Sequence, residues 1–284
     1  MIISRSFRVF AAVLMVFSLL VAGCGAKKST PEQTLSGKVT LSGSTALLPM
    51  AKQAADLFMQ KNKGVLINVS GGGSFTGLNQ VAAGNVDIGM SDVFATSEYK
   101  DKGLVDFQVS VAPFILVVNP SVTVENLTEA QARDIFTGKV TNWKEVGGKD
   151  EKITVVTRTK ASGSRATITD IVLKGQDFTT GAVVQDSNGA LREVVAKTPG
   201  AIGFVDAAYV NDAVKTLAYN GVKYTPENVS TGKYVIWTYE HLYSKGEPKG
   251  ATKAFIDYIL NAEFQNKYVE QTGFIPVSKM QVKK

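Results

Sequence analysis

Three short turns rich in glycine, serine and threonine carry the side chains of this sequence that are best suited to chemistry. They are Gly43-Ser44-Thr45-Ala46, Gly73-Ser74-Phe75-Thr76-Gly77 and Ser162-Gly163-Ser164, and each stands between a predicted strand and a predicted helix. The free N–H groups of a helix's first turn, its dipole and a hydroxyl group can together bind an anion. Serine and threonine are also the preferred helix caps, so each turn alone is explained better by capping than by ligand binding. A shared oxyanion site is therefore a hypothesis, with plain capping as its alternative.

Two charged residues follow predicted strands near these turns. Asp92 comes after the strand that ends Ile88-Gly89-Met90-Ser91, a position where a carboxylate ordinarily caps the next turn. Arg158 comes just before the third turn, after the strand at 153–156. Ligands of open α/β sheets bind at the carboxyl ends of strands, where a guanidinium can hold an anion through two parallel hydrogen bonds. Arg165, inside the next helix, is interpreted as a solvated or supporting charge.

Catalytic motifs are missing from the sequence. It contains no G-x-x-x-x-G-K-[ST] loop, no G-x-G-x-x-G spacing after Gly71 and no G-x-S-x-G elbow. His241 is the only histidine, which excludes histidine-pair metal sites, and we expect it at the surface or at a strand end. No carboxylates have metal-ligand spacing. The sequence therefore favours binding over catalysis and predicts neither a metal nor a cofactor.

Charge and composition describe an ordinary globular chain. Of its 284 residues, 44% are hydrophobic and 20% are charged, and the formal net charge is +6. The basic residues are scattered and form no stripe with interleaved aromatic residues, so we predict no nucleic-acid partner.

The start of the chain has the layout of a secretory signal peptide. Arg5 and Arg8 precede an apolar run at 9–21, and Ala22-Gly23 stand directly before Cys24, the one cysteine of the chain. The cut site resembles the bacterial lipobox, in which the cysteine is lipidated and becomes the first residue. An uncleaved anchor or a buried thiol is the alternative, but the apolar run is short for a spanning helix. We predict a signal peptide at 1–23 and a lipidated N-terminus with a flexible tether at 24–37.

Strands and helices alternate along the rest of the chain, which indicates an α/β protein with largely parallel sheets. Predicted strands cover 38–41, 65–69, 86–90, 109–118, 153–156 and 235–242. The first predicted helix has an apolar face, and Thr128 with Gln131 forms a capping box that opens a helix ending near Phe136. The apolar face of the first helix consists of Leu47, Met50, Ala51, Ala54, Ala55 and Phe58.

Five linked motifs resemble the phosphate-binding protein of bacterial phosphate-specific ABC importers. In chain order they are GSTALLPMA, NVSGGGSFTGLNQVAAGNVDIGMSD, LTEAQARDIFTGKVTNWKEVGG, VTRTKASGSRAT and TPGAIGFVD, and the resemblance runs from about Lys38 to the C-terminus. It implies a two-lobed type II periplasmic-binding-protein fold, with a ligand cleft between lobes that are joined by two crossing strands. The lobes would be 38–114 completed by 239–284, and 115–238.

The resemblance also implies which residues hold phosphate. These residues are Ser44, Thr45, Ala46, Ser74, Asp92, Arg158, Ser162, Gly163 and Ser164. An aspartate facing an anion would supply selectivity, because phosphate near neutral pH keeps a proton that it can donate, whereas sulfate has none. Lys160 stands where relatives often carry an acidic residue that pairs with this arginine, and we hypothesise that its charge speeds anion capture.

We therefore predict a non-enzymatic, exported lipoprotein. It would capture inorganic phosphate and deliver it to membrane permease subunits driven by a cytoplasmic ATPase. It would act as a monomer, anchored through Cys24 on the outer side of the cytoplasmic membrane or in the periplasm. The alternatives are binding of another tetrahedral oxyanion (sulfate, molybdate or tungstate), a secreted phosphoryl-transfer enzyme, and a surface lipoprotein with a sensing or adhesion role.

Overall fold

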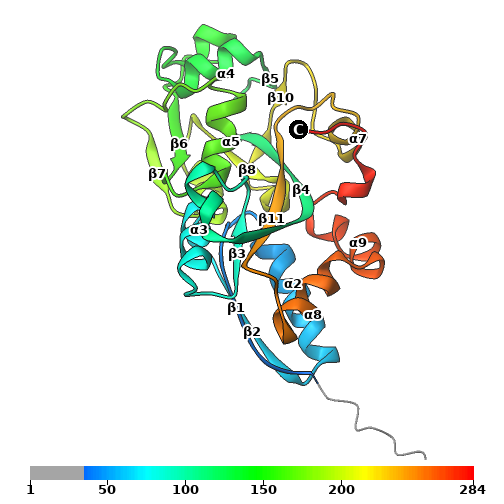
Figure 1. Ribbon diagram of the computed structural model, residues 1–284. Helices are drawn as coiled ribbons and strands as arrows, with labels where there is room; N and C mark the ends of the chain where they lie inside the picture. The colour runs from blue at the N-terminus through cyan, green and yellow to red at the C-terminus, as the bar shows by residue number, and fades with distance from the viewer. Residues whose placement is uncertain (1–34) are drawn as a thin grey trace, which may run out of the picture. The chain divides into compact units, whose positions relative to one another are not determined.

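A computed structural model describes residues 35–284, which form a mixed α/β unit built around one curled sheet (Figure 1). The strand order is β2-β1-β3-β11-β4-β8-β6-β7, with β9 paired to β4, and β5 and β10 form a separate two-stranded sheet. The strands are β1 (Ser36–Gly43), β2 (Gly64–Ser70), β3 (Ile88–Ser91), β4 (Leu104–Val118), β5 (Asn126–Leu127), β6 (Thr154–Arg158), β7 (Val183–Gln185), β8 (Ala201–Asp206), β9 (Lys215–Thr216), β10 (Ala218–Tyr219) and β11 (Trp237–Lys245).

Helices connect most of the parallel strands. The α-helices are α2 (Leu48–Lys61), α3 (Ser74–Ala83), α4 (Glu129–Phe136), α5 (Gly163–Ile171), α6 (Asn188–Lys197), α7 (Pro226–Ser230), α8 (Gly250–Leu260) and α9 (Ala262–Lys267). The short 3₁₀ helices are η2 (Ser97–Lys102), η3 (Trp143–Val146), η4 (Ala207–Tyr209), η5 (Glu270–Thr272) and η6 (Val277–Lys279). Within this part of the chain, no helix combines the length and the apolar character needed to cross a membrane.

Strand direction divides the sheet into two parallel sections. β1 pairs in parallel with β2 and β3, and β6 pairs in parallel with β7 and β8. β4 and β11 are antiparallel to each other and run through the middle of the sheet (Figure 1). The first part of β4 pairs with β11 and its last part, from Phe114, pairs with β8. The chain therefore passes from one section to the other along β4.

The predicted apolar face of the first helix is confirmed. All six of its residues are buried, and α2 packs on β2 and α8. Phe58 meets Phe255 of α8 edge to face, with ring centroids 5.5 Å apart. Burying a side chain of this size stabilises the fold by roughly 1.5–3 kcal/mol. This packing joins the last helices of the chain to its first βαβ unit.

The structure confirms the α/β alternation and most predicted elements, with longer bounds for several. β4 begins at Leu104 rather than at 109, because its first residues are partly or fully exposed and lack a continuous apolar run. β5, β9 and β10 have two residues each, too few to show a period in the sequence. The capping box is confirmed, since the Thr128 hydroxyl accepts from the Gln131 backbone N–H at 3.2 Å.

Candidate functional site

The nine residues predicted to bind an anion lie together in the interior and all are buried. The first turn, between β1 and α2, is shaped by its own serine. Ser44 Oγ accepts hydrogen bonds from the backbone N–H groups of Ala46 at 3.0 Å and Leu47 at 3.2 Å. These bonds occupy the acceptor side of the hydroxyl and leave its O–H available to donate. The turn therefore offers a hydroxyl donor in a dry interior.

The glycine-rich turn brings the start of α3 against the start of α5. Gly73 has φ +95°, and a Cβ there would lie 2.4 Å from the carbonyl oxygen of Ala161. A Cβ on Gly163 would lie 2.3 Å from Ser74 Oγ. Both positions require glycine because two segments far apart in the sequence touch at backbone distance. The contact places the first turns of α3 and α5 next to each other.

Asp92 lies between these helix starts. Its Oδ2 accepts from the Ser164 hydroxyl at 2.8 Å, and its backbone N–H donates to Ser74 Oγ at 3.0 Å. Its Oδ1 is buried and accepts no hydrogen bond from residues 35–284. The interpretation of Asp92 as a simple turn cap is therefore wrong, because its carboxylate bonds a residue 72 positions away. Asp92 Oδ1 can therefore accept a hydrogen bond from a ligand.

Arg158 ends β6 and carries the positive charge of the site. Its Nη2 donates to Thr45 Oγ1 at 3.1 Å and to the backbone oxygen of Asp186 at 2.9 Å. Its Nε and Nη1 are buried without a partner in the described chain. Burial lowers the pKa of the guanidinium, and the negative charge of Asp92 acts in the opposite direction. Two nitrogens of one guanidinium thus keep N–H groups that can donate to an oxyanion.

Arg158 is oriented without an acidic neighbour in its own loop. Lys160 is exposed, whereas Arg165 of α5 donates to the Arg158 backbone oxygen at 2.8 Å and stacks over the Phe178 ring at 4.8 Å. Of the two interpretations of Arg165, the supporting charge is the one that fits. Thr45 and the Asp186 carbonyl fix the guanidinium itself.

The third turn caps α5 and also has backbone N–H groups without an intrahelical acceptor. Ser162 Oγ accepts from the Arg165 backbone N–H at 3.2 Å, so the capping role is present. The N–H groups of Gly163 and Ser164 lie in the first turn of α5, before any intrahelical acceptor can reach them. Capping and anion binding are therefore compatible in this turn.

The arrangement can hold a small tetrahedral oxyanion that keeps a proton. The unpartnered nitrogens of Arg158 and the hydroxyls of the three turns supply hydrogen-bond donors, and Asp92 Oδ1 is an acceptor among them. A ligand there must accept many hydrogen bonds and donate one. Groups of three or more histidine, cysteine, aspartate or glutamate side chains placed to bind a metal are missing from residues 35–284.

Four residues near the candidate anion site were not predicted from the sequence. Asn188 Nδ2 donates to Thr45 Oγ1 at 3.2 Å, and the Tyr209 hydroxyl donates to the Thr45 backbone oxygen at 2.5 Å. Asp206 and Glu240 are fully buried carboxyl groups. Glu240 had a signal, since it stands alone as a carboxylate in the apolar strand predicted at 235–242. Asn188 gave no such signal, because its partner Thr45 is 143 positions away in the sequence.

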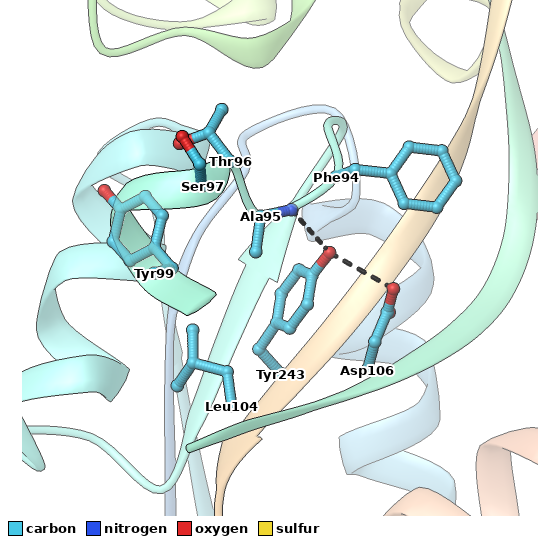
Figure 2. A pocket seen from close by; sticks show the side chains of 8 residues that line it. All are labelled: Phe94, Ala95, Thr96, Ser97, Tyr99, Leu104, Asp106 and Tyr243. Atoms are coloured by element: carbon cyan, nitrogen blue, oxygen red, sulfur yellow. Dashed lines mark hydrogen bonds between the residues drawn. The ribbon is translucent and has the colours of Figure 1, made fainter. Parts of the chain in front are cut away.

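The expectation that His241 lies at the surface or at a strand end is wrong. The residue sits inside β11 with no exposed surface, and its Nδ1 lies 2.8 Å from Asp106 Oδ1. Figure 2 shows the neighbouring pocket of about 350 Å³, where Tyr243 contacts Asp106 and accepts from the Ala95 backbone. None of the nine predicted binding residues lines this pocket. It is therefore separate from the candidate anion site.

Comparison with known proteins identifies close relatives over most of the chain. A profile of the PBP superfamily domain matches residues 28–263. The phosphate-binding protein PstS of Bacillus subtilis is 42% identical, over 96% of this chain and 95% of that protein. The PstS protein of Borreliella burgdorferi is 26% identical, over 95% of this chain and 99% of that protein.

Solved structures resemble the same part of the chain. A phosphate-bound substrate-binding protein from Clostridium perfringens matches with a TM-score of 0.81 and 33% identity, over 85% of this chain and all of that one. An ABC-type phosphate transport receptor from Vibrio cholerae matches with a TM-score of 0.70 and 28% identity, over 84% of this chain and 99% of that one. The fold is thus that of the type II periplasmic binding proteins, as the sequence predicted.

Proposed function

Because this chain belongs to the periplasmic-binding-protein superfamily, among the phosphate-binding proteins of ABC importers, we propose that it captures inorganic phosphate and delivers it to such an importer. It is a solute-binding protein and not an enzyme, in keeping with its family. It acts outside the cytoplasm, as its relatives do.

One observation carries the phosphate assignment. The unpartnered Nε and Nη1 of Arg158 and the unpartnered Oδ1 of Asp92 belong to buried side chains whose charges act on each other. Buried polar groups without partners are costly, so a native site that holds both kinds has a ligand that satisfies both. Phosphate accepts from the guanidinium through its oxygens and donates its remaining proton to the carboxylate.

The same cluster disfavours the other tetrahedral oxyanions. Sulfate, molybdate and tungstate carry no appreciable proton near neutral pH, so each would meet Asp92 as an unpaired like charge. In a site from which water is excluded, that repulsion is only weakly screened. We therefore assign phosphate binding to the nine predicted residues and add Asn188 and Tyr209, which hold Thr45.

Ligand capture involves a hinge between two lobes. We assign 38–114 and 239–284 to one lobe and 115–238 to the other. The change of partners along β4 at Phe114 and the pairing of β4 with β11 support this division. Contacts such as Ser164 with Asp92 then link the lobes across the cleft, and opening breaks them.

The start of the chain serves export and anchoring. Residues 1–34 lie outside the described residues, so the roles of the signal peptide, Cys24 and most of the tether rest on the sequence. The end predicted for the tether at 37 is wrong, because Ser36 and Gly37 already belong to β1. Cys24→Ala is expected to abolish incorporation of labelled palmitate and to release the protein from membranes. Unchanged labelling of the variant would contradict a lipid on Cys24. We expect the protein to act as a monomer, which sedimentation of the purified chain tests.

The phosphate assignment is tested by removing the guanidinium. Arg158→Gln is expected to weaken phosphate binding at least about 30-fold in equilibrium dialysis, because truncating one partner of a buried charged pair costs about 2–5 kcal/mol. Arg133→Gln is the matched control, since Arg133 lies on α4 and pairs with Glu129 on the same helix. Equal affinities of the two variants would contradict the assignment.

A further inference from the structure

Glu240 is a buried carboxyl group that the phosphate site has not yet used. It lies in β11 with no exposed surface, and neither of its oxygens has a hydrogen-bond partner among the described residues. Side chains two apart on a strand share a face, so Glu240 points to the same side as Thr238. The Thr238 hydroxyl donates to the Asp92 backbone oxygen at 2.9 Å. Glu240 therefore faces the end of β3 where Asp92 lies.

The surroundings of Glu240 are negatively charged. The antiparallel pairing of β11 with β3 sets His241 opposite Ser91 and so places Glu240 beside Asp92, and the charges of Asp92 and Asp206 both act on Glu240. Tyr209 of η4 is near both acids and neutral, since burial raises the pKa of its hydroxyl. The positive group of the site, Arg158, acts on Asp92. Three buried carboxylates beside one guanidinium cannot all be ionised, because like charges in a dry interior repel strongly.

The hydrogen bonds decide which acid keeps its charge. Asp92 accepts from the Ser164 hydroxyl at 2.8 Å and is attracted by the positive charge of Arg158. A donated hydrogen bond and a nearby positive charge each stabilise a carboxylate. Glu240 accepts no hydrogen bond, and burial, followed by the charge of Asp92, raises its pKa well above the ordinary value. Burial likewise raises the pKa of Asp206, although the Ala208 N–H opposes it. The proton shared by the facing pair of acids thus resides on Glu240.

We propose that Glu240 is a neutral carboxylic acid that donates a hydrogen bond to the carboxylate of Asp92 and thereby positions Asp92 as the selectivity group of the site. This inference rests on the proposed phosphate-binding function. A carboxylate oxygen has room for two donors, so Oδ1 of Asp92 can accept from Glu240 and from phosphate together. Glu240 is a positioning residue in this role, because it acts on the ligand through Asp92.

Removing the donor weakens the selectivity of the site. The hydrogen bond from Glu240 holds Oδ1 of Asp92 where it can accept the proton of phosphate. Without that bond the carboxylate can turn away from the ligand, so an anion without a proton, such as sulfate, meets less repulsion.

The test compares Glu240→Leu, which loses the donor, with Glu240→Gln, which keeps a neutral donor of similar shape. Phosphate and sulfate affinities of the full chain are measured by calorimetry at neutral pH. We expect Glu240→Leu to lower the preference for phosphate over sulfate about tenfold relative to the wild type, and Glu240→Gln to match the wild type. Glu247→Gln, on an exposed residue, is the control. A wild-type preference in Glu240→Leu, or equal losses in both variants, would overturn the inference.

A second measurement keeps the inference testable if Glu240→Leu does not fold. The carboxyl ¹³C shift of Glu240, assigned by its loss in Glu240→Gln, is expected to be that of a protonated acid at neutral pH. A carboxylate shift there would overturn the inference even if phosphate binds. Failure of the wild type to bind phosphate at any pH would instead overturn the proposed function, since the protonation state of Glu240 is read independently of the ligand.

Discussion

At the scale of single residues, the site depends on two opposite charges that the fold leaves incompletely satisfied. Arg158 keeps two N–H groups free and Asp92 keeps one oxygen free, although both side chains are buried. A cation alone would attract any oxyanion, whereas the added carboxylate rejects those that bring no proton. We therefore propose that affinity comes mainly from Arg158 and the hydroxyls, and selectivity from Asp92.

Replacing Asp92 separates these two contributions. Asp92→Asn is expected to lower the preference for phosphate over sulfate at least tenfold at neutral pH, because an amide carries no charge and can donate to either anion. Competition between labelled phosphate and unlabelled sulfate measures this ratio, and Asp212→Asn, on an exposed residue, is the control. An unchanged ratio would show that the carboxylate does not face the ligand.

The protonation of Glu240 should also make the free energy of unfolding depend on pH. Because burial raises its pKa in the folded state, the folded chain keeps a proton that the unfolded chain loses above the ordinary value of 4.5. The free energy of unfolding of the wild type should then fall with rising pH between the unfolded and folded values, by up to about 1.4 kcal/mol per pH unit.

Glu240→Gln lacks this titration, so its stability relative to the wild type should increase with pH above the unfolded value. Denaturant unfolding of both proteins at several pH values measures the difference. Asp206 contributes a slope of the same sign to both proteins, so it cancels in the comparison. Parallel curves for the two proteins would contradict a neutral Glu240.

Sequence reasoning reached the residues that lie in short motifs and missed those that act across the fold. Ser44, Ser74 and Ser162 follow strands in recognisable turns, so spacing alone raised them as candidates. Asn188 and Tyr209 reach Thr45 from 143 and 164 positions away, and no local pattern records such a contact. His241 was misjudged because a histidine's burial depends on its strand's neighbours rather than on its own sequence.

At the scale of elements, the first turns of α3 and α5 supply hydrogen-bond donors, and glycines allow these two turns to approach each other. The first turns of α3 and α5 approach so closely that Gly163 has no room for a side chain beside Ser74. Strand β3 ends at the same place and delivers Asp92 between them. The geometry of the site is thus a consequence of how tightly these three elements converge.

Gly163→Ala tests that convergence. The added methyl group is expected to push Ser74 and Asp92 away and to weaken phosphate binding at least tenfold, since its Cβ would lie 2.3 Å from Ser74 Oγ and 2.9 Å from Asp92 Cβ. Gly181→Ala is the matched control, because Gly181 is exposed and its nearest neighbour would lie 3.9 Å from the new Cβ. Calorimetry compares the two variants. Similar affinities would show that the helix starts do not need to touch for binding.

At the scale of the whole molecule, the described residues form one sheet whose two parallel sections are connected by β4 and β11. The alternation of strands and helices predicted the α/β class, and the five family motifs predicted the type II fold. Alternation could not give the strand order, because β11 enters between β3 and β4 from a distant part of the chain. That insertion brings Glu240 and Thr238 next to Asp92, which is why sequence spacing gave no hint of their relation.

The central claim is that the chain binds phosphate and rejects oxyanions that lack a proton. Calorimetric titration of the full chain at neutral pH with phosphate, arsenate and sulfate tests it most directly. Arsenate shares the shape and the protonation of phosphate, so we expect both to bind at one site and sulfate to bind negligibly. Sulfate binding as strong as phosphate binding, or no heat from phosphate, would contradict the claim.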